Sequence, residues 1–141
     1  MCMVVYIASD VPLQLIQWNI DQPNFHVSEL TADKNDEKVK GQFSKPFIYY
    51  VGAYTGCGCG FEYGRYPEYE EDAEKKHQSV NQFSKYLASA LQESETIELF
   101  TCWEGDQAEK PVKHGKLIPA DIGGDSFWFE EKEFFVVQQS Q

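Results

Sequence analysis

The sequence is poor in basic charge. Arg65 is the only arginine among 141 residues, and 12 basic side chains stand against 23 acidic ones, which gives a formal net charge of −11. The lysines are scattered and form no basic cluster. Because nucleic acid backbones and anionic lipid surfaces repel such a chain, we expect neither nucleic acid nor a membrane as its partner. A small molecule, a metal ion or a protein is the expected partner.

Long apolar runs are also missing. Residues 1–8 are largely apolar, but no basic residue precedes them, and Asp10 and Pro12 interrupt the run before it reaches the length of a signal peptide. No stretch approaches the roughly 20 apolar residues of a membrane span. We therefore expect a cytoplasmic protein with reduced cysteines, in which residues 1–8 form a first strand and Cys2 lies in the core.

The composition predicts a single folded domain over residues 1–141. Hydrophobic residues make up 42% of the chain and aromatic residues 15%, enough for a core that needs no disulfide. Residues 12–23 show no regular spacing and predict an irregular segment packed on that core. Residues 25–27 predict a short edge strand, and the charged residues 31–40 predict an exposed loop.

The second half of the chain contains the clearest strand and helix patterns. Residues 47–54 and 96–103 are apolar runs typical of buried strands, and residues 70–91 have the apolar spacing of one long helix. Residues 127–129 and 134–137 predict a terminal hairpin. The whole indicates an α/β or α+β fold with a mixed sheet of about five strands. If the strands before and after the helix are parallel neighbours, they form a βαβ-like unit.

The most unusual feature is the loop Gly56-Cys57-Gly58-Cys59-Gly60, between the strand at 47–54 and the helix. Ligands bind beyond the carboxyl ends of strands in open α/β sheets, which is where this loop lies. In an extended chain Cys57 and Cys59 project to one face, as two ligands of one soft metal do. Cys102, at the end of the next strand, and His77, on the inward face of the helix, are the expected further ligands. Zinc and iron are the candidate ions.

The same loop also suits a small ligand. Its glycines permit close backbone approach, so that adjacent N–H groups form a concave nest. Arg65 either clamps a carboxylate or phosphate beside the loop or pairs with a neighbouring glutamate, and Trp103 either lines a pocket or fills the core. The candidate ligand-binding residues are Cys57, Cys59, Arg65 and Trp103.

Several familiar motifs are absent. The loop lacks the Gly-x-Gly-x-x-Gly and Gly-Lys-Ser/Thr patterns of phosphate-binding loops and the two-residue spacer of redox Cys-x-x-Cys motifs. Two alternatives to a ligand or soft-metal site remain. One is a thiol-dependent enzyme in which Cys57 or Cys59 attacks and His77 or His114 is the base. The other is a noncatalytic protein-interaction domain whose cysteines are structural.

Overall fold

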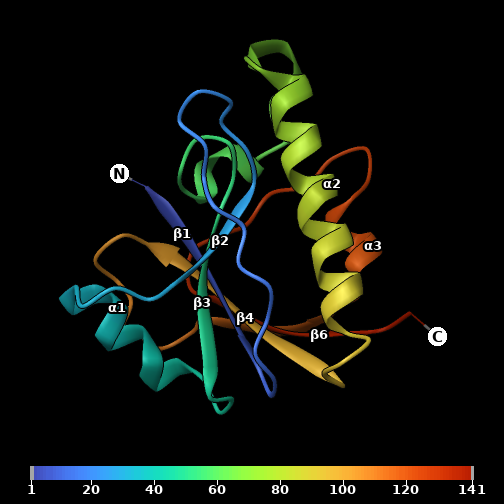
Figure 1. Ribbon diagram of the computed structural model, residues 1–141. Coiled ribbons are helices and arrows are strands. Elements are labelled where there is room, and N and C mark those ends of the chain that lie inside the picture. Colours follow the sequence, from blue (N-terminus) through green and yellow to red (C-terminus); the bar gives the residue numbers. More distant parts are fainter. Residues whose placement is uncertain (1, 141) are drawn as a thin grey trace.

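The computed structural model describes residues 2–140 and shows a single α+β domain built on a six-stranded mixed sheet (Figure 1). The predicted fold class is confirmed, with one strand more than expected. The strand order is β2-β3-β1-β4-β6-β5. The strands are β1 (Met3–Ser9), β2 (His26–Glu29), β3 (Phe47–Gly52), β4 (Thr96–Trp103), β5 (Lys113–Leu117) and β6 (Glu133–Gln138). Met1, where the predicted first strand began, and Gln141 lie outside the described residues.

The N-terminal strand β1 occupies the middle of the sheet. All seven of its residues are buried, and it pairs antiparallel with β3 on one side and with β4 on the other. β3 and β4 are therefore parallel to each other, but they are not neighbours. The expectation of an adjacent βαβ pair is wrong in this respect, because the apolar first strand is inserted between the two. The end of β3, the end of β4 and the start of β1 consequently share one edge of the domain.

The long helix α2 (Ala73–Ala90) covers one face of the sheet. It buries Val80, Phe83, Leu87 and Ala90 against that face, which confirms the predicted apolar stripe. The helix begins later than expected, because Asp72 takes a left-handed conformation with φ of 55°. A short 3₁₀ turn, η3 (Pro67–Tyr69), precedes it.

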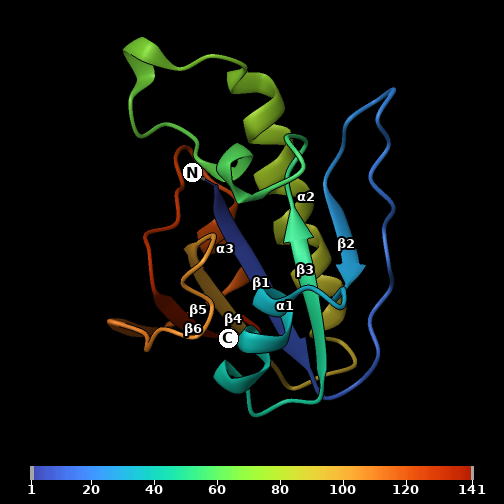
Figure 2. The ribbon, with the colours of Figure 1, turned by 90° about the vertical axis from the view of Figure 1, so that its left-hand side faces the viewer.

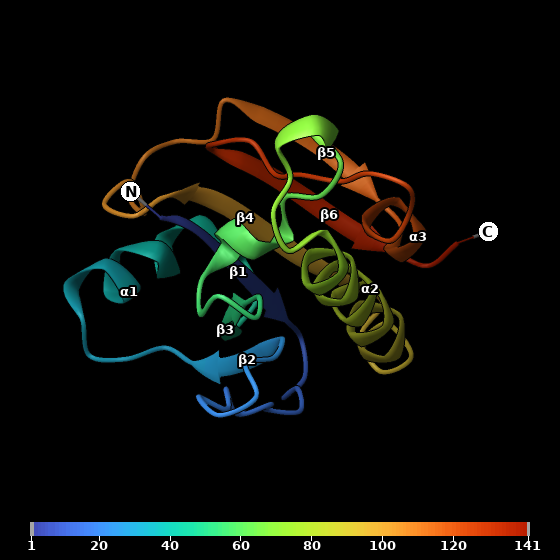
Figure 3. The same ribbon diagram turned by 90° about the horizontal axis from the view of Figure 1, so that it is seen from above.

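A second helical segment lies on the opposite face of the sheet (Figure 3). The predicted exposed loop at 31–40 is instead α1 (Lys34–Val39), followed by the 3₁₀ turn η1 (Lys40–Gln42). Asp33 caps α1 by accepting a hydrogen bond from the Asn35 amide, and Val39 is fully buried. Burial of Val39 and the cap at Asp33 thus stabilise a helix in a segment whose many charged residues predicted a loop.

The chain between β1 and β3 follows the sequence more closely. Residues 12–23 are irregular, and Leu13 and Ile16 pack on the main core as expected. Ile16 also forms a bridge with Val27 of β2, the edge strand.

The C-terminal hairpin predicted from residues 127–129 and 134–137 does not form. Phe127 exchanges two backbone hydrogen bonds of 2.6 Å with Tyr63, while β6 pairs with β4 and, in parallel, with β5. Residues 113–117, which form β5, show no apolar alternation, and the strand is mostly exposed. A short helix, α3 (Pro119–Ile122), follows it and contacts α2. Among residues 2–140, no helix is both long and apolar enough to cross a membrane.

Candidate metal centre and adjoining cavity

The glycine-cysteine loop begins with a tight reversal after β3. The Ala53 amide donates to the Cys57 carbonyl at 2.9 Å, and the Gly56 amide donates to the Ala53 carbonyl at 3.0 Å. Gly56 has φ of +91°, a conformation that other residues rarely adopt. The Tyr50 hydroxyl donates to the Gly56 carbonyl at 3.0 Å. The reversal returns Cys57 to the end of β3 instead of letting the chain move away from the sheet.

The next two glycines let the chain lie directly on the sheet as the 3₁₀ turn η2 (Gly58–Phe61). A Cβ atom on Gly58 would come within 2.8 Å of the Val5 side chain and 2.9 Å of the Met3 carbonyl oxygen. One on Gly60 would come within 2.7 Å of the Ala53 Cβ. The missing side chains of these two glycines therefore permit close packing of the loop on the sheet. Phe61 is fully buried and anchors the turn.

This packing brings together three sulfur atoms from two distant parts of the chain. The Sγ atoms of Cys2, Cys57 and Cys59 all lie within 4.8 Å of one another. Cys2 immediately precedes β1, whose start lies beside η2 because β1 runs antiparallel to β3 (Figure 2). The Met3 amide donates to Cys59 Sγ at 3.3 Å, and the Thr55 hydroxyl lies 3.8 Å from Cys57 Sγ. These three cysteines, the thiol cluster, can hold one metal ion.

The thiol cluster concentrates negative charge on one sulfur. Hydrogen bonding from the Cys59 thiol is the main cause that lowers the pKa of Cys57 from 9.0 to about 5, although partial burial opposes it. The same hydrogen bond raises the pKa of Cys59, which is its donor. A hydrogen bond to Cys57 is also the main cause that raises the pKa of Cys2. These shifts favour a thiolate on Cys57 in the metal-free cluster, with the thiols of Cys2 and Cys59 as its donors.

Cys2 was predicted to lie in the core, and this prediction is wrong. It is exposed. The position of Cys2 directly before a strand does not by itself indicate a ligand. It does so only once β1 is known to pair with β3.

Cys102 does not join the thiol cluster. Its side chain is fully buried beside Val4 and Phe100, on the sheet face that α1 covers. Burial raises the pKa of Cys102 to about 12. Since successive side chains of a strand point to opposite faces, the side chains of Cys102 and its neighbour Trp103 lie on different faces of the sheet.

His77 does not join it either. Its ring stacks on Tyr63 with centroids 4.7 Å apart, and its Nε2 atom lies 3.3 Å from the Asn81 side-chain amide nitrogen. His114, the other base considered for a thiol enzyme, lies on the exposed strand β5 near Phe134. The structure brings neither histidine into the group of three sulfurs.

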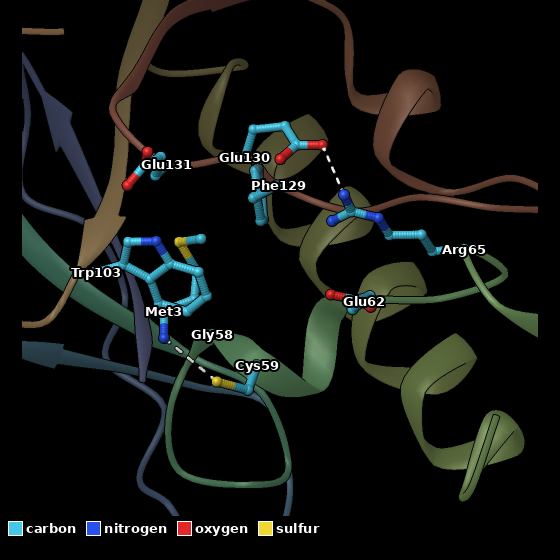
Figure 4. A pocket seen from close by; sticks show the side chains of 9 residues that line it. All are labelled: Met3, Gly58, Cys59, Glu62, Arg65, Trp103, Phe129, Glu130 and Glu131. Carbon is cyan, nitrogen blue, oxygen red and sulfur yellow. Dashed lines mark hydrogen bonds and ion pairs between the residues drawn. The ribbon is translucent and has the colours of Figure 1, made fainter. Parts of the chain in front are cut away.

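A cavity of about 300 Å³ adjoins the thiol cluster and unites three of the four predicted ligand-binding residues (Figure 4). Cys59, Arg65 and Trp103 all line it. The Arg65 guanidinium lies 3.4 Å from a Glu130 carboxylate oxygen, so the ion pair considered from the sequence forms, but with a more distant glutamate. The remaining lining residues are Met3, Gly58, Glu62, Phe129, Glu130 and Glu131.

Comparison with protein-family models, curated proteins and solved structures finds no match to this chain.

Proposed function

We propose that the protein binds a thiophilic metal ion through Cys2, Cys57 and Cys59. The observation that supports this is the mutual approach of the three Sγ atoms to within 4.8 Å. Zinc–thiolate bonds are about 2.3 Å long, so two sulfurs of a tetrahedral site lie about 3.8 Å apart. Metal binding would therefore contract the cluster by side-chain rotation, and two of its members, Cys2 and Cys59, are exposed.

Three thiolates with a free fourth position suit zinc better than iron. Iron bound by cysteines alone, in clusters, uses four thiolates, whereas zinc is stable with three protein ligands and a water or other exchangeable group. Within residues 2–140, no histidine or carboxylate completes the sulfur group. The site is therefore of the open kind, in which the ion remains accessible to a further ligand.

The ion is a bound ligand of a folded protein in this proposal, and not a requirement for folding. The main core is built largely from sheet residues, α2 and buried aromatic rings such as Phe61 and Phe129, and none of its members is a cysteine of the cluster. A domain with such a core folds without metal, in contrast to zinc fingers.

Elemental analysis tests the proposal. Protein produced with zinc in the medium and purified under reducing conditions without chelator should contain close to one zinc ion per chain. Cys2→Ser, Cys57→Ser and Cys59→Ser should each lower the zinc content severalfold or more, because each removes one of only three thiolates. Cys102→Ser is the matched control and should retain the ion.

Cobalt substitution gives a second readout, since thiolate-to-cobalt charge-transfer absorption reports sulfur ligation directly. A wild-type protein with neither zinc nor this absorption would overturn the proposal. So would equal loss of metal in the Cys102→Ser control. Absence of metal with reactive thiols would favour the thiol-enzyme alternative, and absence of metal with inert thiols would favour a protein-interaction domain.

A further inference from the structure

The cavity beside the thiol cluster combines an apolar wall with a carboxylate rim (Figure 4). Met3, Trp103 and Phe129 supply the apolar surface, and Glu62, Glu130 and Glu131 supply the carboxylates. Its volume of about 300 Å³ is at the small end of the range in which proteins bind organic ligands.

Among residues 2–140, Arg65 is the only cationic side chain that lines the cavity, and it already has partners within the protein. Arg65 pairs with Glu130, and its guanidinium carbon lies 5.4 Å from the ring centroids of both Tyr66 and Trp128. Glu130 also accepts a hydrogen bond from the Trp128 indole at 3.0 Å. An anionic ligand would have to displace these contacts and then face three carboxylates.

Two of the carboxylates have no such partner. Among residues 2–140, the side chains of Glu62 and Glu131 make no ion pair and no hydrogen bond, although both line the cavity. Their charge is available to a ligand.

The indole N–H of Trp103 has no hydrogen-bond acceptor among residues 2–140, in contrast to those of the other two tryptophans. The indole N–H of Trp18 donates to the Tyr54 carbonyl at 3.1 Å, and that of Trp128 donates to Glu130. The half-buried Trp103 indole has no hydrogen-bond acceptor and no aromatic or cationic partner within the part of the chain that the structure describes. Its ring and its N–H group are both free to contact a molecule in the cavity.

We propose that this cavity binds a small organic cation, an ammonium group attached to an apolar body. The carboxylates of Glu62 and Glu131, on opposite sides of the cavity (Figure 4), attract the ammonium group, and the apolar body lies on the Trp103 ring. Ammonium ions are attracted both by carboxylates and by the face of an indole ring, and both interactions strengthen when water is displaced. The inference goes beyond the metal proposal and does not need it, because the carboxylates and aromatic rings form the site without an ion on the sulfurs.

Three probes of similar size separate charge from shape. 2-Phenylethylamine, which is cationic at neutral pH, is compared with neutral 2-phenylethanol and anionic 3-phenylpropionate. Binding is followed by the indole N–H signals in a ¹⁵N–¹H correlation spectrum of metal-free, chelator-treated protein, and Trp103→Phe assigns the signal. The amine should shift the Trp103 signal saturably, the alcohol should bind about tenfold more weakly, and the acid should cause no shift.

Charge-matched variants locate the site. The double variant Glu62→Gln, Glu131→Gln should weaken amine binding about tenfold and leave alcohol binding unchanged. Glu29→Gln, Glu95→Gln removes the same charge from exposed glutamates that do not line the cavity and should have little effect. Unchanged secondary structure by circular dichroism accompanies both variants.

Equal binding of the three probes, or a shift that leaves out Trp103, would overturn the inference. An equal loss in the control variant would do the same, because it would show attraction by the net charge alone. Since the protein is metal-free throughout, these outcomes do not depend on whether the thiol cluster binds zinc.

Discussion

Cys57 and Cys102 have the same side chain and lie near the same edge of the sheet, yet their environments are opposite. Cys57 sits in a loop after β3, half-buried among two other thiols, with its pKa lowered to about 5. Cys102 is the penultimate residue of β4 and packs in an apolar cluster, where burial raises its pKa to about 12. Nearness to a sheet edge therefore does not bring a thiol into the cluster. What decides is whether the local backbone turns the side chain toward other sulfurs or toward the core.

The largest expected effect separates the core from the thiol cluster. Phe83 is fully buried between α2 and the sheet, so Phe83→Ala should lower the free energy of unfolding by about 3–5 kcal/mol. The triple variant of Cys2, Cys57 and Cys59 to Ser should cost about 1 kcal/mol in the metal-free protein, because these side chains lie outside the core. Urea unfolding of both variants in chelator measures the difference. A triple variant as unstable as Phe83→Ala would mean that the cluster is structural.

Thiol labelling compares Cys57 and Cys102 directly. At pH 7 a thiol of pKa about 5 is almost entirely thiolate, whereas one of pKa about 12 is about 10⁻⁵ thiolate. The lower intrinsic nucleophilicity of the more acidic thiol recovers a factor of about 10³. Cys57 should therefore react with iodoacetamide at least about 100-fold faster, and burial of Cys102 adds to the ratio.

Mass spectrometry of peptides after timed labelling gives both rates, and labelling in urea provides the control in which the two thiols become equally accessible. Native-state rates within tenfold of each other would contradict the contrast between the two sites.

The sequence predicted the elements whose pattern is local. Residues 96–103 are apolar throughout and form β4 over that range, and the spacing of Val80, Phe83 and Leu87 correctly identified the buried face of α2. β5 and α1 were missed because β5 has no buried residue and α1 has only Val39, which leaves no apolar periodicity in the chain. The central place of β1 was not predictable either, since it depends on pairing with strands far away in sequence.

The candidate site shows the same division. Cys57 and Cys59 were identified because their spacing is local, and Cys2 was missed because its approach to them depends on where β1 pairs. Cys102 is a different case. The alternation of side chains along β4 implies that Cys102 and Trp103 face opposite sides, so the sequence already contained a reason to separate the two.

Gly58→Ala should weaken the thiol cluster while leaving Cys102 unaffected. The new Cβ would lie 2.9 Å from the Met3 carbonyl oxygen and 2.8 Å from the Val5 side chain, so the loop must move away from β1. That movement separates Cys59 from Cys2. A cost of about 1–3 kcal/mol is typical for such overpacking, and we expect a loss of zinc affinity of about tenfold.

Gly41→Ala is the matched control, because no atom lies within 4 Å of a Cβ at that position. Competition with a chromogenic zinc chelator measures both affinities. Wild-type affinity in Gly58→Ala would show that the sulfurs do not depend on close packing of the loop against β1.

The smallest expected effect concerns His26, a polar group that this end of the sheet buries. Its ring lies over Gly52, near Trp18 and Tyr50, and the negative charge on Cys57 acts on it. Burial lowers the pKa of His26 below its ordinary 6.5, although the Cys57 thiolate partly opposes this. The unfolded chain therefore binds more protons than the folded one just below pH 6.5, and stability should fall as the pH drops through that value.

The measurement uses a Cys57→Ser background, so that this thiol does not titrate. Urea unfolding between pH 7.5 and 5.5 should show a decline that His26→Phe reduces. A decline of the same size in both proteins would assign the pH dependence to other groups.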